Sequence, residues 1–207
     1  MFILGLTGSI AMGKSTAAAM FRRLGVPVFD ADRTVHDLLG PNGEAHEAVA
    51  AAFPDAVVGG RLDRAAIGRH VFNDPAALRR LERLLHPRVR GHQCRFLNIM
   101  ARRRVPLVVL DIPLLFETGG EKSCDAVAVV SAPWFVQEQR ILARPGMDRR
   151  RLRATLARQM PDGEKRRRAD FVIPTGLGKA ETMRCIRAIV DRCRVKPGRR
   201  RPSFAAH

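Results

Sequence analysis

Residues 8–15 of the chain read Gly8-Ser9-Ile10-Ala11-Met12-Gly13-Lys14-Ser15, which fits the pattern G-x-x-x-x-G-K-[ST]. This pattern is typical of a loop that wraps a phosphate with its backbone N–H groups, and its glycines permit the tight backbone path. Lys14 can reach the β- and γ-phosphates of a nucleotide, and the Ser15 hydroxyl can bind Mg²⁺. The loop therefore predicts binding of ATP or GTP together with Mg²⁺.

The segments on either side of the loop are those that a phosphate loop requires. Residues 2–7 are a continuous apolar run, typical of a fully buried parallel strand, and residues 15–24 carry apolar side chains at helical spacing. Residues 26–29 predict a second strand. Strand, loop, helix and strand form a βαβ unit, in which the positive end of the helix points at the bound phosphate.

The rest of the chain alternates between strand and helix patterns. Residues 107–111, 126–130 and 171–173 are short, apolar and rich in valine or isoleucine, which predicts strands. Residues 133–168 are predicted to be helical and basic, and residues 183–190 to form a last helix. This alternation predicts an α/β fold with a parallel sheet covered by helices on both faces.

The middle of the chain, residues 33–104, is predicted to be mostly helical. Asp63 and Asp74 are expected N-caps of two helices, and Pro75 stands at the first helical position of the second. Pro87 is expected to break or bend that second helix, because proline lacks a backbone N–H and its ring clashes with the preceding turn.

Composition and charge narrow the class of protein. The chain has 207 residues, of which 46% are hydrophobic and 28% charged, which predicts one globular domain rather than a disordered chain. Its net charge is +17, and 32 of the 37 basic residues are arginine, whose planar fork binds phosphate, so a polyanionic partner is expected. From residue 196 to residue 207 the chain is rich in arginine, proline and glycine, which predicts a basic disordered tail.

The sequence also predicts where the protein works. No apolar run is long enough to span a membrane. The four cysteines form no C-x-x-C pair and are expected to be free thiols in a reducing cytoplasm.

Three carboxylates follow predicted strands, which is where ligands bind in open α/β sheets. Asp30 and Asp32 follow the second strand, and a carboxylate there can accept a hydroxyl proton or hold Mg²⁺ through water. The alternative for either one is an N-cap of the next helix. Asp111 ends the strand at residues 107–111, either as an acid that supports a metal ion or as a solvated strand end.

The basic segment at residues 133–168 predicts a lid. Gln137, Arg140 and Arg144 recur at helical spacing, so they are expected to share one face. A basic lid over ATP needs one or two arginines to stabilise charge during phosphoryl transfer. The other arginines of the segment are expected to be solvated.

The ordered set of motifs resembles the dephospho-CoA kinase family over about residues 1–193. The motifs are GLTGSIAMGKST at 5–16, GVPVFDAD at 25–32, LDR at 62–64, LLHP at 84–87, DIPLLFE at 111–117, QEQR at 137–140 and ADFVI at 169–173. The resemblance implies a P-loop kinase fold in which residues 1–195 form one domain. That domain would contain a nucleotide-binding core, a helical acceptor-binding region at about 33–104 and a lid at about 137–168.

The resemblance also implies a reaction, the ATP-dependent phosphorylation of the ribose 3′-hydroxyl of dephospho-CoA, which is the last step of coenzyme A synthesis. It implies that Asp32 is the catalytic base, with Lys14 and Arg140 assisting. The residues implied to contact ATP are Ser9, Ile10, Ala11, Met12, Gly13, Lys14, Ser15, Thr16 and Arg144, of which Ser15 would also bind the metal. The residues implied to contact the acceptor are Asp30, Arg64, His86 and Leu114. From the residues alone, His86 is equally well interpreted as a core or capping histidine before a proline.

The chain departs from the family pattern in three places, one of which is the basic tail from Lys196. Ala11 stands where the family commonly has glycine, which tests how tightly the loop must turn. Pro174 and Thr175 stand where the family usually has asparagine, which bears on a contact beside the adenine.

Two alternative functions remain open at this point. Another small nucleoside or nucleotide kinase would carry the same phosphate loop, whereas a regulatory GTPase is disfavoured because no N-K-x-D pattern occurs. A nucleic-acid-binding ATPase is favoured by the charge, but the chain has no tyrosine and one tryptophan, and stacking platforms for bases need aromatic side chains. Nucleic acid is therefore not the expected partner, and the sequence predicts no oligomeric state.

Overall fold

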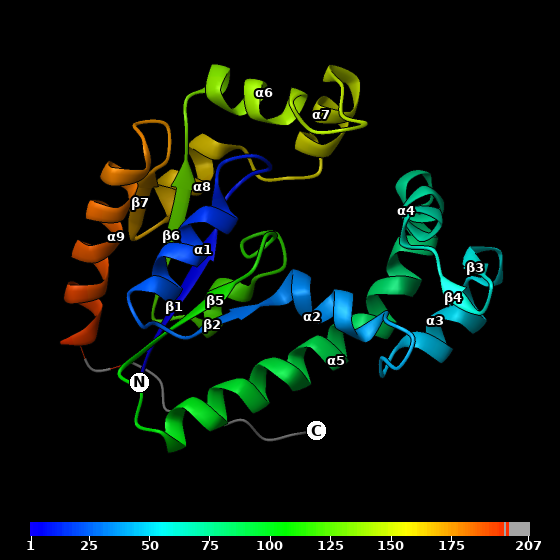
Figure 1. Ribbon diagram of the computed structural model, residues 1–207, viewed down its shortest axis with the longest axis horizontal. Coiled ribbons are helices and arrows are strands. Elements are labelled where there is room, and N and C mark those ends of the chain that lie inside the picture. The colour runs from blue at the N-terminus through cyan, green and yellow to red at the C-terminus, as the bar shows by residue number, and fades with distance from the viewer. Residues whose placement is uncertain (197, 199–207) are drawn as a thin grey trace. The chain divides into compact units, whose positions relative to one another are not determined.

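A computed structural model describes residues 1–196 and 198. The chain divides into two compact units (Figure 1). The first contains Met1–Asp30 and the described residues from Ile99 onward, and the second contains Ala31–Asn98. The expected tail at residues 196–207 lies outside the described residues, apart from residues 196 and 198.

The first unit is built on a five-stranded sheet in which every pairing is parallel. The strand order is β2-β5-β1-β6-β7, so the strand that leads into the phosphate loop lies in the centre. The strands are β1 (Phe2–Thr7), β2 (Val28–Asp30), β5 (Leu107–Asp111), β6 (Ala126–Ser131) and β7 (Phe171–Pro174). All residues of β1, β5 and β6 are buried, as a sheet with helices on both faces requires. The predicted α/β fold with a parallel sheet is confirmed.

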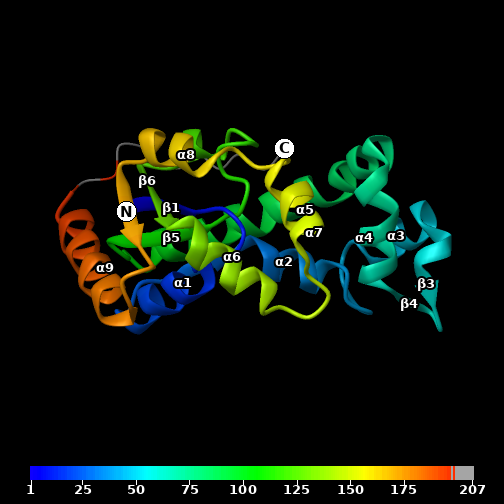
Figure 2. The same cartoon turned by 90° about the horizontal axis from the view of Figure 1, so that it is seen from above.

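Helices cover the two faces of this sheet. They are α1 (Lys14–Arg23) and α9 (Lys179–Arg194) on one face and α8 (Asp162–Arg168) on the other. The unit also contains α6 (Trp134–Leu142), α7 (Arg149–Leu156) and a short 3₁₀ turn η2 (Gly120–Ser123). Side chains of β6 alternate between the faces: Ala128 and Val130 pack in the cluster that contains α1 and α9, whereas Val127 and Val129 pack in a different one. Figure 2 shows α1 and α8 on opposite sides of the strands.

The second unit is mostly helical, as predicted. Its elements are α2 (Ala31–Leu38), α3 (His46–Ala52), the 3₁₀ turn η1 (Pro54–Ala56), β3 (Val57–Val58), β4 (Arg61–Leu62), α4 (Arg64–Asn73) and most of α5 (Pro75–Arg102). Leu38, Val49, Phe53, Ile67 and Leu85 form the centre of its own apolar core. The antiparallel β3–β4 hairpin was not predicted, because strands of two residues carry no usable periodicity.

Both helix caps predicted in this unit are confirmed. The Asp63 side chain accepts a hydrogen bond from the Ala65 N–H at 2.8 Å, at the start of α4. The Asp74 carboxylate accepts from Ala76 at 2.7 Å and from Ala77 at 3.1 Å, at the start of α5. Local sequence is enough to place such caps, because a short side chain satisfies N–H groups that the helix itself leaves free.

The expected break at Pro87 is wrong, since α5 runs through it for 28 residues. Leu85 before the proline and Val89 after it both belong to the core of the unit, so one continuous helix buries more apolar surface than a broken one. The Arg88 guanidinium also donates to the Leu84 carbonyl at 2.6 Å, within the same stretch of helix. Tertiary burial here outweighs the helix-breaking tendency of proline.

Two further expectations concern the whole chain. Among the described residues, no helix is long and apolar enough to cross a membrane. The four cysteines, Cys94, Cys124, Cys185 and Cys193, are free thiols. Cys193 is fully buried in the core, and this burial raises the pKa of its thiol to about 11.

Candidate active site

The phosphate loop connects the central strand β1 to helix α1, as the sequence predicts. Gly13 directly precedes the helix at φ 87°, a conformation that favours glycine. Gly8 is required for a different reason, because a Cβ there would lie 2.3 Å from Val130 Cγ2 and 2.8 Å from the Val130 carbonyl oxygen. Two glycines of the motif are thus fixed by backbone conformation and by space.

Ala11 occupies the left-handed region at φ 61°. For an L-residue with a side chain this conformation costs roughly 1–2 kcal/mol, which explains why a glycine suits the position. The Ala11 methyl is nevertheless buried, against Ile141 of α6 and Leu152 of α7. Burial of the methyl therefore offsets part of the backbone strain.

Lys14 forms an ion pair with Asp111, the last residue of β5, with 2.7 Å between Nζ and Oδ1. Asp111 is 2% exposed, so the carboxylate is held in a region from which water is largely excluded. The ammonium has three donors and can keep this contact while it directs another proton at a phosphate. Of the two interpretations of Asp111, the solvated strand end is wrong, and the acid that supports a metal ion stays a prediction.

A second carboxylate lies beside Asp111. Asp30 ends β2 and pairs in register with Asp111 on the neighbouring strand. Its Oδ2 lies 3.5 Å from Nη2 of Arg22 on α1. Asp32 is two residues further along, in the first turn of α2 and exposed, and it belongs to the second unit. The helix begins at Ala31, so Asp32 is inside the helix and is not its N-cap.

The oxygen ligands at this end of the sheet suit a magnesium ion that arrives with a nucleotide. Ser15 is exposed at the start of α1 and Asp111 ends the strand next to β1, so a hydroxyl and a carboxylate are available. Among the described residues, no group of three or more His, Cys, Asp or Glu side chains could form a cage for a metal ion. One or two protein oxygens combined with phosphate oxygens and water is the usual mode of Mg²⁺ binding.

The predicted lid begins on α6, whose first residue, Trp134, is half-exposed. Gln137 and Arg140 point into contacts with the core: Gln137 is 3% exposed, and Arg140 donates to Thr175 through both Nη1 and Nη2. Arg144 is exposed and lies beyond the end of the helix at Leu142. The expectation that Arg144 shares a helix face with the other two is therefore wrong, since the helix ends too early.

Thr175 links three parts of this site. It is buried, and its hydroxyl donates to the Met12 carbonyl in the phosphate loop at 2.7 Å. The same oxygen accepts from Arg140 Nη1 at 3.2 Å, and the Thr175 carbonyl accepts from Arg140 Nη2 at 2.6 Å. A residue that the sequence marks only as a departure from the family pattern thus connects the loop to a predicted catalytic arginine.

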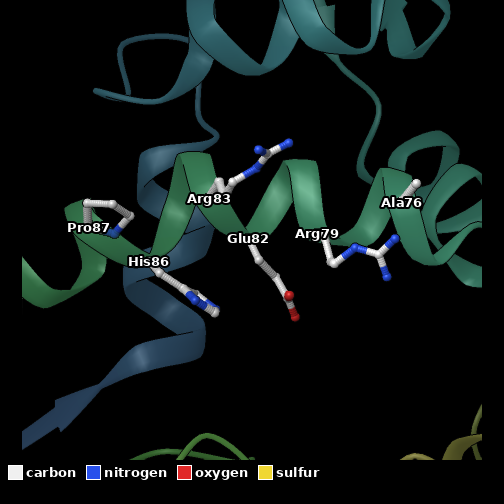
Figure 3. Close-up of a pocket in the computed structure, with 6 residues that line it drawn as sticks. All are labelled: Ala76, Arg79, Glu82, Arg83, His86 and Pro87. Carbon is white, nitrogen blue, oxygen red and sulfur yellow. The ribbon is translucent and has the colours of Figure 1, made fainter.

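The predicted acceptor residues are divided equally between the two units, with Arg64 and His86 in the second. Arg64, at the start of α4, donates to Nδ1 of His36 on α2. His86 is exposed and lines a pocket of about 630 Å³ along α5, so it is not a core histidine. Arg79 and Arg83 line the same pocket (Figure 3).

Leu114 is a predicted acceptor residue that lies in the first unit, as Asp30 does. It follows β5, and its side chain is 37% exposed. Its carbonyl accepts a hydrogen bond from the Thr118 hydroxyl at 2.8 Å.

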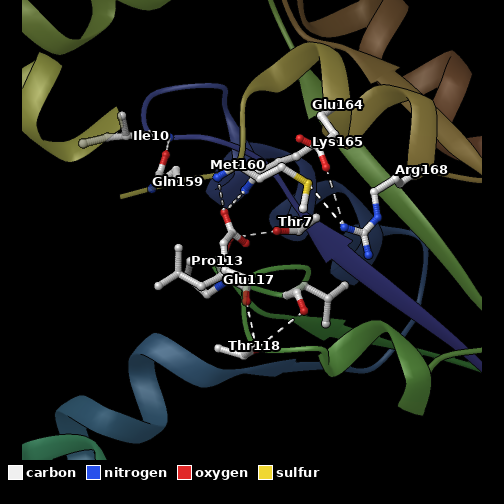
Figure 4. A network of polar contacts seen from close by, with 12 residues as sticks. Thr7, Ile10, Pro113, Glu117, Thr118, Gln159, Met160, Glu164, Lys165 and Arg168 are labelled. Atoms are coloured by element: carbon white, nitrogen blue, oxygen red, sulfur yellow. Dashed lines mark hydrogen bonds and ion pairs between the residues drawn. The ribbon is translucent and has the colours of Figure 1, made fainter. Parts of the chain in front are cut away.

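A buried ion pair behind the phosphate loop was missed by the sequence analysis. Lys165 of α8 is fully buried and lies 2.8 Å from Glu117 Oε1, which also accepts from the Met160 N–H at 2.8 Å (Figure 4). Burial, the largest single influence, acts to raise the pKa of Glu117. Hydrogen bonds from Lys165 and Met160 together outweigh it and hold the pKa below its ordinary value. Glu117 ends the DIPLLFE motif, which was the only signal in the sequence, and Lys165 stood among arginines expected to be solvated.

Comparison with known proteins identifies the family. The family model described as "Dephospho-CoA kinase" matches residues 2–179, which include both units. The chain belongs to the dephospho-CoA kinase family. It is therefore a kinase, a transferase for which ATP is the phosphoryl donor.

Similar proteins come from several bacteria. A dephospho-CoA kinase of Paramagnetospirillum magneticum is 65% identical over 166 residues, which cover 80% of this chain and 78% of the relative. One from Rhodopseudomonas palustris is 51% identical over 97% of this chain and 100% of the relative. The solved dephospho-CoA kinase of Campylobacter jejuni is 26% identical, with a TM-score of 0.62 over 92% of this chain and 96% of that one. TT1252 from Thermus thermophilus is 38% identical, with a TM-score of 0.80 over 95% and 98%.

Proposed function

We propose that this member of the dephospho-CoA kinase family transfers the γ-phosphoryl group of ATP to the ribose 3′-hydroxyl of dephospho-CoA and so completes coenzyme A synthesis. The observation that carries the proposal is the extent of the family match, residues 2–179. A phosphate loop on a parallel sheet serves many kinases, so that part of the match indicates only a nucleotide. The match continues through Ala31–Asn98, the unit with the predicted acceptor residues, and there it indicates the acceptor.

On the nucleotide side, the backbone of residues 9–16 and the N-terminus of α1 would surround the phosphates. The loop N–H groups and the helix dipole both favour an anion there. Lys14 would bind the β- and γ-phosphates while Asp111 holds its ammonium in place, an orientation supported by the 2.7 Å ion pair. Arg144, exposed just beyond α6, would add a further contact to ATP.

Ser15 and Asp111 would hold the magnesium ion that accompanies ATP, Asp111 directly or through water. When bound, this ion withdraws negative charge from the phosphate oxygens. The chain's own contribution is to present a hydroxyl and a buried carboxylate at the carboxyl end of the sheet.

In the reaction, Asp32 would act as the general base. Its carboxylate takes the proton of the ribose 3′-hydroxyl as that oxygen forms a bond to the γ-phosphorus, and the bond from phosphorus to the β,γ-bridging oxygen breaks to release ADP. Asp30 would lie beside this proton transfer. Arg140, oriented by its two hydrogen bonds to Thr175, would neutralise charge on the phosphoryl group in flight.

The acceptor would bind to the second unit. Arg64 and His86 are the residues that the family resemblance assigns there, with Leu114 contributed by the first unit. The α5 pocket supports this assignment, because its lining includes Arg79 and Arg83 together with His86, and the two arginine charges outnumber that of Glu82 and suit a polyanionic acceptor. We further propose that residues at about 33–104 form the acceptor-binding region and residues at about 137–168 the lid.

A coupled assay of ADP release tests the proposal. Purified protein is incubated with Mg·ATP and dephospho-CoA, and in parallel with adenosine, with AMP and without acceptor. We expect ADP release only with dephospho-CoA, with coenzyme A as the product identified by mass.

Other outcomes would contradict the proposal in distinct ways. Equal turnover of AMP or adenosine would keep the kinase chemistry and overturn the acceptor. ADP release without any acceptor would instead indicate an ATPase.

A further inference from the structure

The backbone of Ile10, in the phosphate loop, is held by glutamine side chains at the two peptide groups that flank it. The Ile10 N–H donates to Gln159 Oε1 at 3.0 Å, and the Ile10 carbonyl accepts from Gln137 Nε2 at 2.8 Å. A backbone N–H can meet only the amide oxygen of a glutamine, and a carbonyl can meet only its NH₂ group. The two contacts therefore fix the orientation of both side-chain amides.

The two glutamines lie in different parts of the predicted lid segment, residues 137–168, one at its start and one after α7. Gln137 lies in α6 and is buried, whereas Gln159 follows α7 and is partly buried. Between them, Ile141 and Leu152 pack on the methyl of Ala11, the residue after Ile10. Hydrogen bonds and apolar contacts thus join the lid segment to the same two residues of the loop.

The buried ion pair described above holds Gln159 in place. The next residue, Met160, donates its N–H to Glu117, and Lys165 binds the same carboxylate oxygen (Figure 4). Figure 4 shows Gln159 directed at Ile10 and Met160 directed at Glu117. Two neighbouring residues of the predicted lid segment therefore contact the phosphate loop and the segment after β5.

We propose that Gln137 and Gln159 are positioning residues that hold the phosphate loop in its nucleotide-binding conformation. Neither acts on the phosphates itself. Each satisfies one backbone group of Ile10: Gln159 binds the N–H, in the peptide group shared with Ser9, and Gln137 binds the carbonyl, in the peptide group shared with Ala11. Loss of either contact leaves that peptide group free to rotate toward another partner. Once the correct loop conformation is only partly populated, the apparent dissociation constant of ATP rises in inverse proportion to that population.

The inference rests on the proposed function for its ligand, so the first test measures binding rather than turnover. Gln137→Met and Gln159→Met keep the length of the side chain and remove its polar atoms. We expect each to weaken Mg·ATP binding in calorimetric titration by about tenfold, the effect of one unsatisfied backbone group. Gln139→Met, at an exposed position of the same helix, is the matched control and should bind as the unaltered protein does.

A second pair of variants separates hydrogen-bond polarity from charge. Gln159→Glu keeps an acceptor for the Ile10 N–H, whereas Gln137→Glu places a carboxylate against the Ile10 carbonyl, which it cannot bind as a donor. Both variants add one negative charge beside the backbone of Ile10. We therefore expect Gln137→Glu to weaken Mg·ATP binding about tenfold more than Gln159→Glu does.

Kinetics then distinguish positioning from a general loss of structure. The KM for ATP should rise in both methionine variants, while the KM for dephospho-CoA stays near that of the Gln139→Met control. The double methionine variant should bind only slightly more weakly than either single one, because the two contacts hold the adjacent peptide groups on either side of Ile10 and are therefore coupled.

Two results would overturn the proposal. Unchanged Mg·ATP affinity in both methionine variants would show that the loop keeps its conformation without them. Equal affinities in the two glutamate variants would show that polarity at Ile10 is irrelevant. If Gln137→Met fails to fold, the Mg·ATP affinities of Gln159→Met and Gln159→Glu still decide whether the contact to the Ile10 N–H positions the loop. Failure of the proposed function is distinguishable, because the unaltered protein would then itself fail to turn over dephospho-CoA.

Discussion

The phosphate loop and the α5 pocket differ in how their side chains are held. Around the loop, Asp111, Gln137 and Thr175 are buried and pair with the backbone or with another charge. Along the pocket, Arg79, Arg83 and His86 are exposed on one helix. A triphosphate is thus met by a site that folding has already assembled, and the proposed acceptor is met by charged side chains on a helix face.

This difference predicts how substitutions divide. Changes beside the loop should alter stability and nucleotide binding together, because the same buried contacts serve both. Changes along the pocket should alter acceptor binding and leave stability nearly unchanged, because exposed charges contribute little to folding.

Replacement of the proposed base should have the largest effect. We expect Asp32→Asn to lower kcat by about 10²–10⁴-fold, the usual contribution of a general base, with little change in ATP affinity or stability, since the side chain is exposed. Steady-state kinetics with dephospho-CoA measure this, and Asp37→Asn, exposed on the same helix, is the control. A near-normal kcat in Asp32→Asn would exclude this residue as the base.

The buried ion pair behind the loop should give the second-largest effect. Glu117→Gln leaves the ammonium of the fully buried Lys165 without a countercharge, which costs about 3–5 kcal/mol in the free energy of unfolding. Denaturant titration at neutral pH measures this loss. If Glu117→Gln lowered the free energy of unfolding by less than the loss of an exposed ion pair does, the contrast between buried contacts at the loop and exposed charges at the pocket would not hold.

The pH dependence of the same variant sharpens this prediction. Because the pKa of Glu117 is lowered by folding, its contribution is complete above the pKa of the unfolded chain and is lost as pH falls through the folded pKa. The stability gap between the unaltered protein and Glu117→Gln should therefore narrow as the pH is lowered. A gap that is constant with pH would show that Glu117 does not titrate with folding.

Much of the fold and of the candidate site could be predicted from the sequence. The features that could not be predicted share a physical reason. The phosphate loop and the caps at Asp63 and Asp74 depend on neighbours in the chain, so local patterns find them. The bond between Gln159 and Ile10 spans 149 residues, and Glu117 lies 48 positions before Lys165. Such contacts follow from tertiary packing, which also keeps α5 continuous through Pro87.

The pocket arginines should show a moderate effect. We expect Arg83→Ala to raise the KM for dephospho-CoA by about three- to tenfold, the effect of one exposed charged contact, and to leave the melting temperature unchanged. The ratio of KM values should shrink as salt is added, because salt screens exposed charges. Arg90→Ala, exposed on α5 but outside the pocket lining, is the matched control.

The smallest effect is expected at the strained loop position. Ala11→Gly relieves the strain of the left-handed conformation. It also removes a buried methyl and increases the conformational entropy of the unfolded chain, so the free energy of unfolding should change by less than about 1 kcal/mol. Ala11→Val should cost more than about 2 kcal/mol, because a β-branched residue tolerates this conformation poorly. Thermal unfolding measures both, and equal stability of the two variants would contradict the strain.

The half-exposed Trp134 at the start of α6 gives this protein a built-in optical reporter. The chain contains one tryptophan and no tyrosine, so its ultraviolet fluorescence arises almost alone from the first turn of α6, three residues before the predicted lid. Any movement that changes the hydration of that indole shifts the emission, and no dye or engineered residue is needed. Stopped-flow mixing with nucleotide can therefore test whether this helix moves, separately from phosphoryl transfer.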